Sequence, residues 1–360
     1  MPINYFNGAY QNRKVLITGH TGFKGTWLTC WLNKLGANVF GLSLKEERTH
    51  FDLLKPEGTS FFGDIRNLEF VNEVIQSVKP EIIFHLAAQS LVSESYLEPM
   101  MTYHTNLNGS LNILEAVRKN NKVKALIMVT TDKVYENNSK LIRYKENDSL
   151  GGYDPYSSSK ACVEILTQSY RRSFFETENK VFIASVRAGN VIGGGDWAQN
   201  RLIPDLIRGV SENKPTFIRM PSALRPWQHV LDPLSGYLMV GQNLLEEKKE
   251  FATAWNFGPV PSTLVPVSKV VMKMKSEWSK LSFQLNNDSN QPFHESDKLL
   301  LNCENSLRKL RWFPAWDLED AIHKTVDWYR TLIEKNTLLT TQQLDEYLID
   351  AKSKNLKWCR

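Results

Sequence analysis

The 360-residue sequence contains few cysteines and no long apolar segment. The four cysteines lie far apart, without C-x-x-C or mixed cysteine–histidine spacing, at Cys30, Cys162, Cys303 and Cys359. This pattern indicates neither a zinc site nor a disulfide framework, so we expect no metal site and a reducing, cytoplasmic environment. No apolar run approaches the roughly 18 residues that a membrane span needs. We therefore expect a soluble protein without a membrane partner.

Runs of like charge are also absent. Lys and Arg number 44 against 39 Asp and Glu, so the net charge of +5 is spread thinly over the chain. This distribution differs from the concentrated basic surface of a nucleic-acid-binding protein, although it suits an anionic substrate. A hydrophobic share of 42% is ordinary for a globular protein, and no long stretch has a disordered composition.

From Lys14 onward the sequence alternates short β-branched segments with amphipathic ones. The predicted strands are residues 14–18, 38–42, 60–63, 81–85, 125–130 and 181–187. The predicted helices begin near Gly25, Leu68, Pro99 and Pro155. This alternation predicts an α/β fold with a Rossmann-like, doubly wound parallel sheet.

A glycine-rich turn follows the first predicted strand. Gly19-His-Thr-Gly22-Phe-Lys-Gly25 leads directly into the helical segment TWLTCWLNKLG. Glycines at this spacing allow a tight turn and the close approach of a pyrophosphate, while the helix N-terminus supplies N–H donors. We predict a dinucleotide site here, with Phe23 and Lys24 as further cofactor contacts beside the glycines.

The type of dinucleotide is left open by the second strand. An acidic residue at its end would favour NAD, but the segment is Gly41-Leu-Ser43-Leu-Lys45, so NAD and NADP both remain possible at this point. After the third strand, Asp64 is placed to accept from the adenine amino group, with a helix N-cap as the alternative. Other predicted cofactor contacts follow the third and fourth strands, at Ile65, Leu86, Ala87 and Ala88.

A second motif combines a tyrosine and a lysine. Tyr156-Ser-Ser-Ser-Lys160 places both side chains on one face of a predicted helix, where the ammonium can lower the pKa of the phenol. Such a spacing also occurs on ordinary exposed helix faces. Upstream, the apolar segment ALIMVT opens into TTDKVY at 130–135, at the carboxyl end of a strand, where open α/β sheets bind ligands.

Six motifs occur in order over most of the chain: GHTGFKG, HLAAQS, TTDKVYEN, DPYSSSK, RAGNVIGGGDW and RPWQHVLD. Through them the sequence resembles the CDP-glucose 4,6-dehydratases, which are extended short-chain dehydrogenases/reductases, from roughly Lys14 to Arg330. The segment TTQQLDEYL near the end is also similar to this family. Related dTDP-glucose enzymes carry Asp-Glu where this chain has Asp132-Lys133, and the lysine favours the CDP branch.

The resemblance implies NAD as cofactor and a catalytic role for Thr131, Asp132, Lys133, Tyr156 and Lys160. Tyr156, activated by Lys160 and aided by Thr131, would take the proton of the sugar O4 as hydride leaves C4. Lys133 would remove the C5 proton while Asp132 protonates the departing C6 hydroxyl. Hydride would then return to C6. Lys133 must be partly neutral and Asp132 protonated, and both conditions require burial or a suitable neighbour.

The resemblance also implies residues that hold the pyrophosphate of a nucleotide sugar. These are Asn190, Arg201, Arg225 and Asn256. Arg225 stands beside a proline and a tryptophan that can orient its guanidinium, whereas an exposed loop position is the alternative for Arg201. Asn106 is expected to support Tyr156 through water, with an amide at a helix kink as the alternative.

We expect an NAD-binding Rossmann domain with the catalytic segment in residues 1–190, and mainly a smaller C-terminal substrate-binding lobe in 191–360. Some of the later segments are expected to return to the Rossmann domain, and residues 317–331 and 334–360 to form further helices. The helices near Pro99 and Pro155 resemble the pair that forms a dimer interface in this superfamily, which predicts a homodimer.

The predicted function is NAD-dependent dehydration of CDP-D-glucose to CDP-4-dehydro-6-deoxy-D-glucose, for deoxysugar and O-antigen polysaccharide biosynthesis. The alternatives are a dehydratase of another nucleotide sugar, a 4-epimerase, or a non-catalytic NAD-binding regulator. An epimerase needs no elimination residues, so Asp132 and Lys133 beside Thr131 favour the dehydratase. The regulator is disfavoured because Thr131, Tyr156 and Lys160 are intact.

Overall fold

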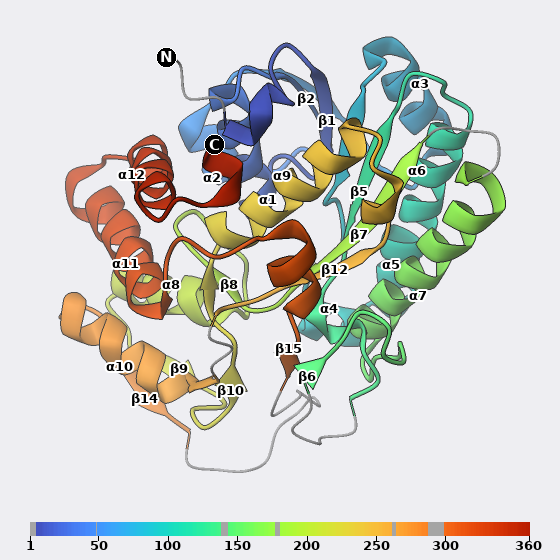
Figure 1. The fold of residues 1–360 in the computed structure, drawn as a ribbon. Coiled ribbons are helices and arrows are strands. Elements are labelled where there is room, and N and C mark those ends of the chain that lie inside the picture. Colours follow the sequence, from blue (N-terminus) through green and yellow to red (C-terminus); the bar gives the residue numbers. More distant parts are fainter. Residues whose placement is uncertain (1–4, 48, 138–142, 177–180, 261–263, 287–298) are drawn as a thin grey trace.

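A computed structural model describes residues 5–47, 49–137, 143–176, 181–260, 264–286 and 299–360. Its centre is a seven-stranded parallel sheet with the order β12-β7-β5-β4-β1-β2-β3 (Figure 1). The strands are β1 (Lys14–Thr18), β2 (Asn38–Ser43), β3 (Thr59–Phe62), β4 (Ile82–His85), β5 (Ala125–Val129), β7 (Phe182–Ala188) and β12 (Ala254–Phe257). The strand order reverses between β1 and β4, where doubly wound sheets bind ligands.

The α/β prediction is confirmed, and each of the six predicted strands is present with its ends within one residue. Three of the predicted helices begin where expected, in α3 (Leu68–Val78), α5 (Pro99–Tyr103) and α7 (Pro155–Tyr170). Helix α1 (Phe23–Lys34) begins two residues before Gly25, because the chain already turns at Gly22. Helix α5 is only the first part of a longer helical segment. After Tyr103 the chain passes through a π-helical turn, η2 (His104–Asn108), and then into α6 (Gly109–Arg118).

The two faces of the sheet carry separate apolar cores. Alternate residues of a strand point to opposite faces, so Val15 and Ile17 pack with α1 and α9 (Leu231–Leu245), whereas Leu16 packs with α3 and α6. Helices α3, α6 and α7 cover one face, and α1 and α9 cover the other (Figure 1). Both faces of the sheet are buried, as a parallel sheet requires.

Segments from the second half of the chain complete this sheet. Strand β12 pairs in parallel with β7, from Ala254 opposite Ser185 to Phe257 opposite Ala188. Part of residues 191–360 therefore belongs to the central sheet. We use the word lobe for the elements α8 (Leu202–Glu212), β9 (Thr216–Ile218), α10 (Val267–Glu277) and β14 (Phe283–Leu285), which lie outside that sheet, and for the segments around them.

The remaining elements are short or lie near the C-terminus. They are η1 (Tyr5–Gly8), α2 (His50–Leu54), α4 (Val92–Leu97), η3 (Asp132–Val134), β6 (Arg143–Tyr144), η4 (Arg171–Phe175), β8 (Val191–Ile192), β10 (Leu224–Arg225), β11 (Gln228–His229), η5 (Lys249–Phe251), β13 (Val265–Pro266), β15 (Leu300–Leu301), η6 (Ser306–Leu310), α11 (Leu318–Lys335), α12 (Thr340–Ser353) and η7 (Lys357–Cys359). Helices α11 and α12 correspond to the two helices predicted after residue 317.

The C-terminal helix α12 is attached to the central core by a buried carboxylate. Asp232 of α9 accepts hydrogen bonds from the Tyr347 hydroxyl (2.8 Å) and the Ala315 N–H (2.8 Å). Rings of Trp31 and Trp358 pack around Tyr347. Among the described residues, no helix is both long and apolar enough to cross a membrane.

Candidate active site

A pocket of about 730 Å³ runs along the carboxyl ends of the parallel strands and under the lobe. Its wall contains the glycine turn, the ends of β2, β3, β4, β5 and β7, and parts of α8 and β9. Every predicted site residue lines this pocket except Asn106 and Asn256. Residues from both halves of the chain therefore meet in one cavity.

The glycine turn is as close-packed as its sequence predicts. Gly19 has φ +75°, and a Cβ built there would lie 2.7 Å from the Ala87 backbone nitrogen. A Cβ on Gly25 would overlap the carbonyl oxygen of Gly19. Gly22 immediately precedes α1 and has no side chain to cap it, so the first-turn N–H groups suit an anionic group. The geometry fits a dinucleotide pyrophosphate.

Asp64 lines the same pocket, just after β3. Its carboxylate accepts from the Arg66 N–H (2.8 Å) and the Arg66 guanidinium (2.6 Å and 2.9 Å), and these bonds lower the pKa of Asp64. The N-cap of α3 is instead Asn67, which accepts from the Phe70 N–H at 3.1 Å. The alternative role of Asp64 as that N-cap is therefore wrong.

Sequence reasoning missed two further pocket residues in this region. Arg66 lines the cavity, and its place two residues after Asp64 was the available signal. Glu46 also lines it, one residue beyond the segment that ended at Lys45 without an acidic group. Ser43 lines the cavity too, and its hydroxyl lies 3.0 Å from Nδ1 of His20.

Tyr156 is positioned by the first turn of α7. Pro155 occupies the first helical position, and Asp154 caps the helix by accepting from the Ser157 N–H at 2.9 Å. Burial raises the pKa of Tyr156 to about 12, and a hydrogen bond to Thr131 is the largest opposing effect. The expectation of a lowered phenol pKa is thus wrong for this arrangement, because desolvation dominates.

Lys160 lies one helical turn after Tyr156 and is almost fully buried. Its Nζ donates to the Val129 carbonyl oxygen at 3.1 Å, at the end of β5. Burial, and then the charge of Lys24, lowers the pKa of Lys160 to about 8. Lys24 reaches the same cavity from α1, and burial lowers its pKa to about 8 as well. Two lysines with lowered pKa values, Lys160 and Lys24, therefore line this pocket.

Asp132 and Lys133 occupy the turn that follows β5. Asp132 Oδ1 accepts from the Thr131 hydroxyl at 3.1 Å, and Oδ2 is buried with no hydrogen-bond partner among the described residues. A Cβ on Gly189 would overlap this carboxyl group, so glycine is needed there. Burial raises the pKa of Asp132, which favours the protonated form that an acid requires. Lys133 is half-buried and lines the pocket.

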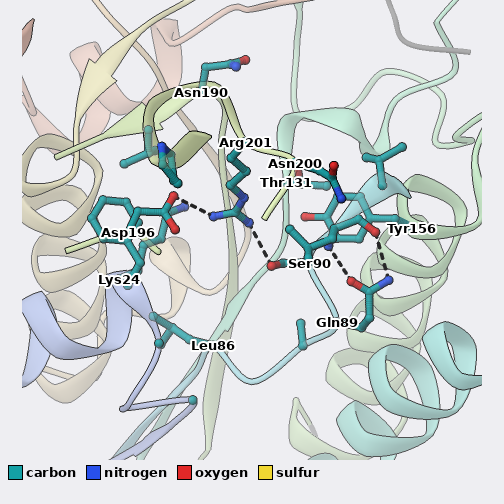
Figure 2. Close-up of a pocket in the computed structure, with 18 of the residues that line it drawn as sticks. Lys24, Leu86, Gln89, Ser90, Thr131, Tyr156, Asn190, Asp196, Asn200 and Arg201 are labelled. Atoms are coloured by element: carbon teal, nitrogen blue, oxygen red, sulfur yellow. Dashed lines mark hydrogen bonds and ion pairs between the residues drawn. The ribbon is translucent and has the colours of Figure 1, made fainter. Parts of the chain in front are cut away.

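Arg201 bridges the two sides of the cavity. It precedes α8 and donates to Asp196 Oδ2 at 3.1 Å and to Ser90 Oγ at 2.9 Å. Figure 2 shows it between these partners, with Thr131 and Tyr156 beyond Ser90. Arg201 is therefore a pocket residue with two polar partners, although its side chain is 35% exposed and lies in the loop before α8.

Two other predicted substrate residues also reach the pocket. Arg225 is 6% exposed, and its charge opposes the rise in the pKa of Asp132. Asn190 follows β7 and is half-buried, while its carbonyl accepts from the Gln228 N–H at 3.2 Å. Further pocket residues that the sequence did not single out are Gln89, Ser90, Asp196 and Asn200. Gln89 and Ser90 end the HLAAQS motif and Asp196 lies in RAGNVIGGGDW, but each motif as a whole indicates no separate role for these residues.

Asn256 is placed outside the pocket. It lies in β12 with 0% exposure, and its Nδ2 donates to the carbonyl oxygens of Tyr144 (2.9 Å) and Asn302 (3.1 Å). Its Oδ1 accepts from the Tyr135 hydroxyl at 2.7 Å. Because both ends of this amide hold the protein together, the prediction that Asn256 contacts the substrate needs correction.

Asn106 also lies outside the pocket, inside the π-helical turn η2. Its Oδ1 accepts from the Gln89 N–H (2.8 Å), while Nδ2 donates to the Gln89 carbonyl oxygen and to Ser159 Oγ (2.9 Å each). The structure favours the alternative of an amide at a helix irregularity, which ties the segment after β4 to α7.

Comparison with known proteins agrees with this geometry. The model of the NAD dependent epimerase/dehydratase family matches residues 15–258. The chain belongs to this family. A curated member, CDP-glucose 4,6-dehydratase of Salmonella typhimurium, is 42% identical over 349 residues, which cover 94% of this chain and 97% of the relative.

More distant relatives and solved structures are also similar to this chain. CDP-paratose 2-epimerase of Salmonella typhi is 27% identical, covering 88% of this chain and 98% of that protein. An epimerase structure from Methanothermobacter thermautotrophicus superposes with a TM-score of 0.81 at 24% identity, covering 92% and 96% of the two chains. The Bacillus anthracis dTDP-glucose 4,6-dehydratase, solved in complex with NAD, gives a TM-score of 0.75 at 23% identity, covering 90% and 98%.

Proposed function

We propose that this chain is an NAD-dependent CDP-glucose 4,6-dehydratase, which converts CDP-D-glucose to CDP-4-dehydro-6-deoxy-D-glucose. The observation that carries the proposal is the turn after β5, where Asp132 and Lys133 follow Thr131 in the pocket that also contains Tyr156 and Lys160. This combination provides groups for both hydride transfer and elimination. The 42% identical relative supports CDP as the nucleotide.

The cofactor would lie between the glycine turn and the ends of β3 and β4. Gly19 and Gly25 allow the tight turn that would present backbone N–H groups to its pyrophosphate. Asp64 would accept from the adenosine end, and the Leu86–Ala88 segment would form the floor. When bound, NAD supplies the hydride acceptor and, once reduced, the hydride donor. The cofactor is regenerated in each cycle, so the proposal predicts that it stays bound.

Proton transfer in the oxidation step is assigned to Tyr156. It takes the O4 proton, with Thr131 hydrogen-bonded to its phenol. Burial raises the pKa of Tyr156 to about 12, although Thr131 and the charge of Arg201 oppose the rise. Ionisation of the phenol in this step therefore requires positive charge near it. Arg201 is the cation that lowers the pKa of Tyr156 in the structure, and we assign a supporting role to Lys160, one helical turn after Tyr156 in the same pocket.

Elimination is assigned to Lys133 and Asp132. The C4 ketone acidifies the C5 proton, which Lys133 removes. Asp132, whose pKa is raised by burial, gives its proton to the departing C6 hydroxyl, and water leaves. The proton that Lys133 gained would then return to C5 while the bound cofactor returns its hydride to C6. Net transfer of the O4 proton from Tyr156 to Asp132 would restore both groups, so that the 4-keto-6-deoxy product and water form without net oxidation.

Substrate binding is assigned to Asn190, Arg201 and Arg225, whose amide and guanidinium groups suit a pyrophosphate. We further propose a cytoplasmic homodimer that serves deoxysugar and lipopolysaccharide O-antigen biosynthesis. Exposed apolar side chains on α5 and α7, Met100 (70% exposed) and Ile165 (55% exposed), support these helices as the dimer interface.

Parallel incubations with CDP-, dTDP-, GDP- and UDP-glucose, each with and without added NAD, test the proposal. The absorbance of a 4-keto-6-deoxy sugar in alkali reports the product. We expect the highest rate with CDP-glucose. Equal rates on all four would contradict the CDP assignment. Inversion at C4 without the keto product would identify an epimerase, and NAD binding without conversion of any sugar would identify a regulator.

A further inference from the structure

A buried ion pair lies behind the catalytic turn, outside the groups that the proposed reaction uses. Glu164 of α7 and Arg187 of β7 have side chains only 4% and 3% exposed. Arg187 Nε donates to Glu164 Oε1 at 2.8 Å, and Nη2 donates to Oε2 at 2.9 Å. Such a two-pronged contact fixes both the distance and the relative orientation of the two side chains.

The carboxylate of Glu164 also accepts from two hydroxyl groups. Thr130 Oγ1 donates to Oε1 and Ser185 Oγ donates to Oε2, each at 2.5 Å. Thr130 is the first residue of the TTDKVY turn, whereas Ser185 lies in the interior of β7. Burial raises the pKa of Glu164, but Arg187 and the two hydroxyls outweigh it and the pKa is lowered, so the carboxylate is ionised.

Arg187 reaches the other end of the same turn. Its Nη1 donates to the Tyr135 hydroxyl at 2.7 Å and to the Glu146 carbonyl oxygen at 3.1 Å, and the guanidinium lies 5.0 Å from the centre of the Tyr135 ring. Tyr135 is the last residue of the turn, two positions after Lys133. The ion pair therefore holds the turn at both ends, on either side of the three catalytic residues.

Glu164 is also connected to the Tyr156–Lys160 face of α7. It lies four residues after Lys160, hence on the same side of the helix one turn further on. Its negative charge raises the pKa of Lys160, against the larger opposite effect of burial. The same carboxylate thus contacts the turn and favours the ammonium form of Lys160.

We propose that Glu164 and Arg187 are positioning residues that set the turn 130–135 against α7 for catalysis. Neither side chain lines the pocket. A rigid connection is needed because the elimination groups and the hydride-transfer groups stand on different elements, and small displacements of reacting groups slow a reaction strongly. The identity of the reaction rests on the proposed function, but the placement of the two elements does not.

The hydroxyl partners of Glu164 provide a matched pair of variants. Thr130→Val and Ser185→Ala each remove one buried hydroxyl donor from the same carboxylate, but only Thr130 lies on the turn. We expect Thr130→Val to lower kcat about tenfold with KM changed less than about twofold, and Thr130→Ser to restore kcat. Ser185→Ala should keep kcat within about twofold of the wild-type value. Thr130→Val and Ser185→Ala should lose similar amounts of thermal stability, because each loses one buried hydrogen bond to Glu164. Equal loss of kcat in the two variants, or none in Thr130→Val, would overturn the proposal.

The charges are tested by pH profiles of kcat for Glu164→Gln and Arg187→Lys. Activity is lost as pH rises through the pKa of Lys160, because the ammonium form is required. Glu164→Gln removes the negative charge, so this alkaline limb should move about one pH unit lower. Arg187→Lys keeps the charge but loses the two-pronged contact. Its kcat should fall about tenfold, and the alkaline limb of its pH profile should stay at the wild-type pH.

A limb unchanged in a folded Glu164→Gln protein would contradict the proposal. If Glu164→Gln fails to fold, the Thr130 and Ser185 variants decide alone. Turnover of CDP-glucose by the wild-type protein separates the proposed function from the positioning role of Glu164 and Arg187. Failure on CDP-glucose refutes the proposed function, and the variants are then compared on whichever nucleotide sugar the wild type converts.

Discussion

The two sides of the pocket are built in different ways. On the cofactor side, each functional segment directly follows a strand of the central sheet: the glycine turn after β1, Asp64 after β3, Leu86 after β4 and Thr131 after β5. On the lobe side, Arg201 and Arg225 come from segments that are held by partners far away in the chain. Arg201 bonds Ser90 across 111 residues. The first side is determined by local sequence, and the second by tertiary contacts.

This difference affects how each side responds to mutation. Changes on the cofactor and catalytic side should remove chemistry and leave the fold intact, because the strands that carry those residues are deeply buried in the sheet. Changes on the lobe side should alter substrate affinity or stability.

The largest effect is expected on the catalytic side, from Tyr156→Phe. Loss of the hydroxyl that accepts the O4 proton should lower kcat about 10³-fold, within the usual range for acid–base groups. The circular dichroism spectrum and the affinity for NAD should be close to wild type. A Tyr156→Phe protein with more than about a tenth of wild-type kcat would contradict the role of Tyr156.

Lys133→Met separates the two chemical steps on this side. Methionine fills a similar volume but cannot remove the C5 proton, so turnover should fall about 10²-fold while the oxidation at C4 continues. Rapid-mixing fluorescence should then show NADH accumulating on the enzyme. Nearly intact turnover would show that Asp132 and Lys133 are not elimination residues.

Gly189→Ala tests the boundary between the sides. The added methyl group would overlap the Asp132 carboxyl, which must shift out of its buried position. We expect kcat to fall about tenfold, since misplacement of a reacting group is costly. The thermal midpoint serves as the control: a loss of stability without a loss of kcat would mean that the carboxyl position is unimportant.

On the lobe side, Arg201→Gln should act on binding. Loss of the guanidinium should raise KM for the nucleotide sugar about tenfold, with a smaller effect on kcat. Ser90→Ala, which removes only the contact across the cavity, should raise KM about twofold or less. A larger increase in KM for Ser90→Ala than for Arg201→Gln would show that Arg201 acts by closing the pocket and not by binding the substrate.

The smallest effect is expected far from the chemistry, at Asp232→Asn. Burial raises the pKa of Asp232 to about 7, so the carboxyl favours folding at acidic pH and costs stability as pH rises toward that value. Asparagine keeps an oxygen that can accept from Tyr347 and cannot ionise. The difference in thermal midpoint between the variant and wild type should therefore grow with pH. Between about pH 5 and about pH 8.5 it should shift by about 3 °C in favour of the variant. A pH-independent difference would contradict this assignment.

The cofactor side of the pocket could largely be predicted from the sequence, whereas contacts between distant segments could not. The alternation of apolar segments located all six predicted strands, and the motifs after them located the pocket wall. The role of Asn256 was wrong because nothing local shows that β12 joins β7 at the edge of the sheet and buries this amide. The Glu164–Arg187 contact was equally inaccessible, because it links two elements whose pairing exists only in the folded chain.

The most direct test of the account follows a label through one turnover. CDP-glucose carrying deuterium at C4 is converted by the enzyme with unlabelled NAD, and the product is analysed by mass spectrometry and NMR. The account predicts that the deuterium appears at C6 of the 4-keto-6-deoxy product, with no net NADH. Recovery of the deuterium at C4 of a hexose that still carries its C6 hydroxyl would contradict the proposed hydride transfer. Loss of the deuterium to solvent would contradict it as well.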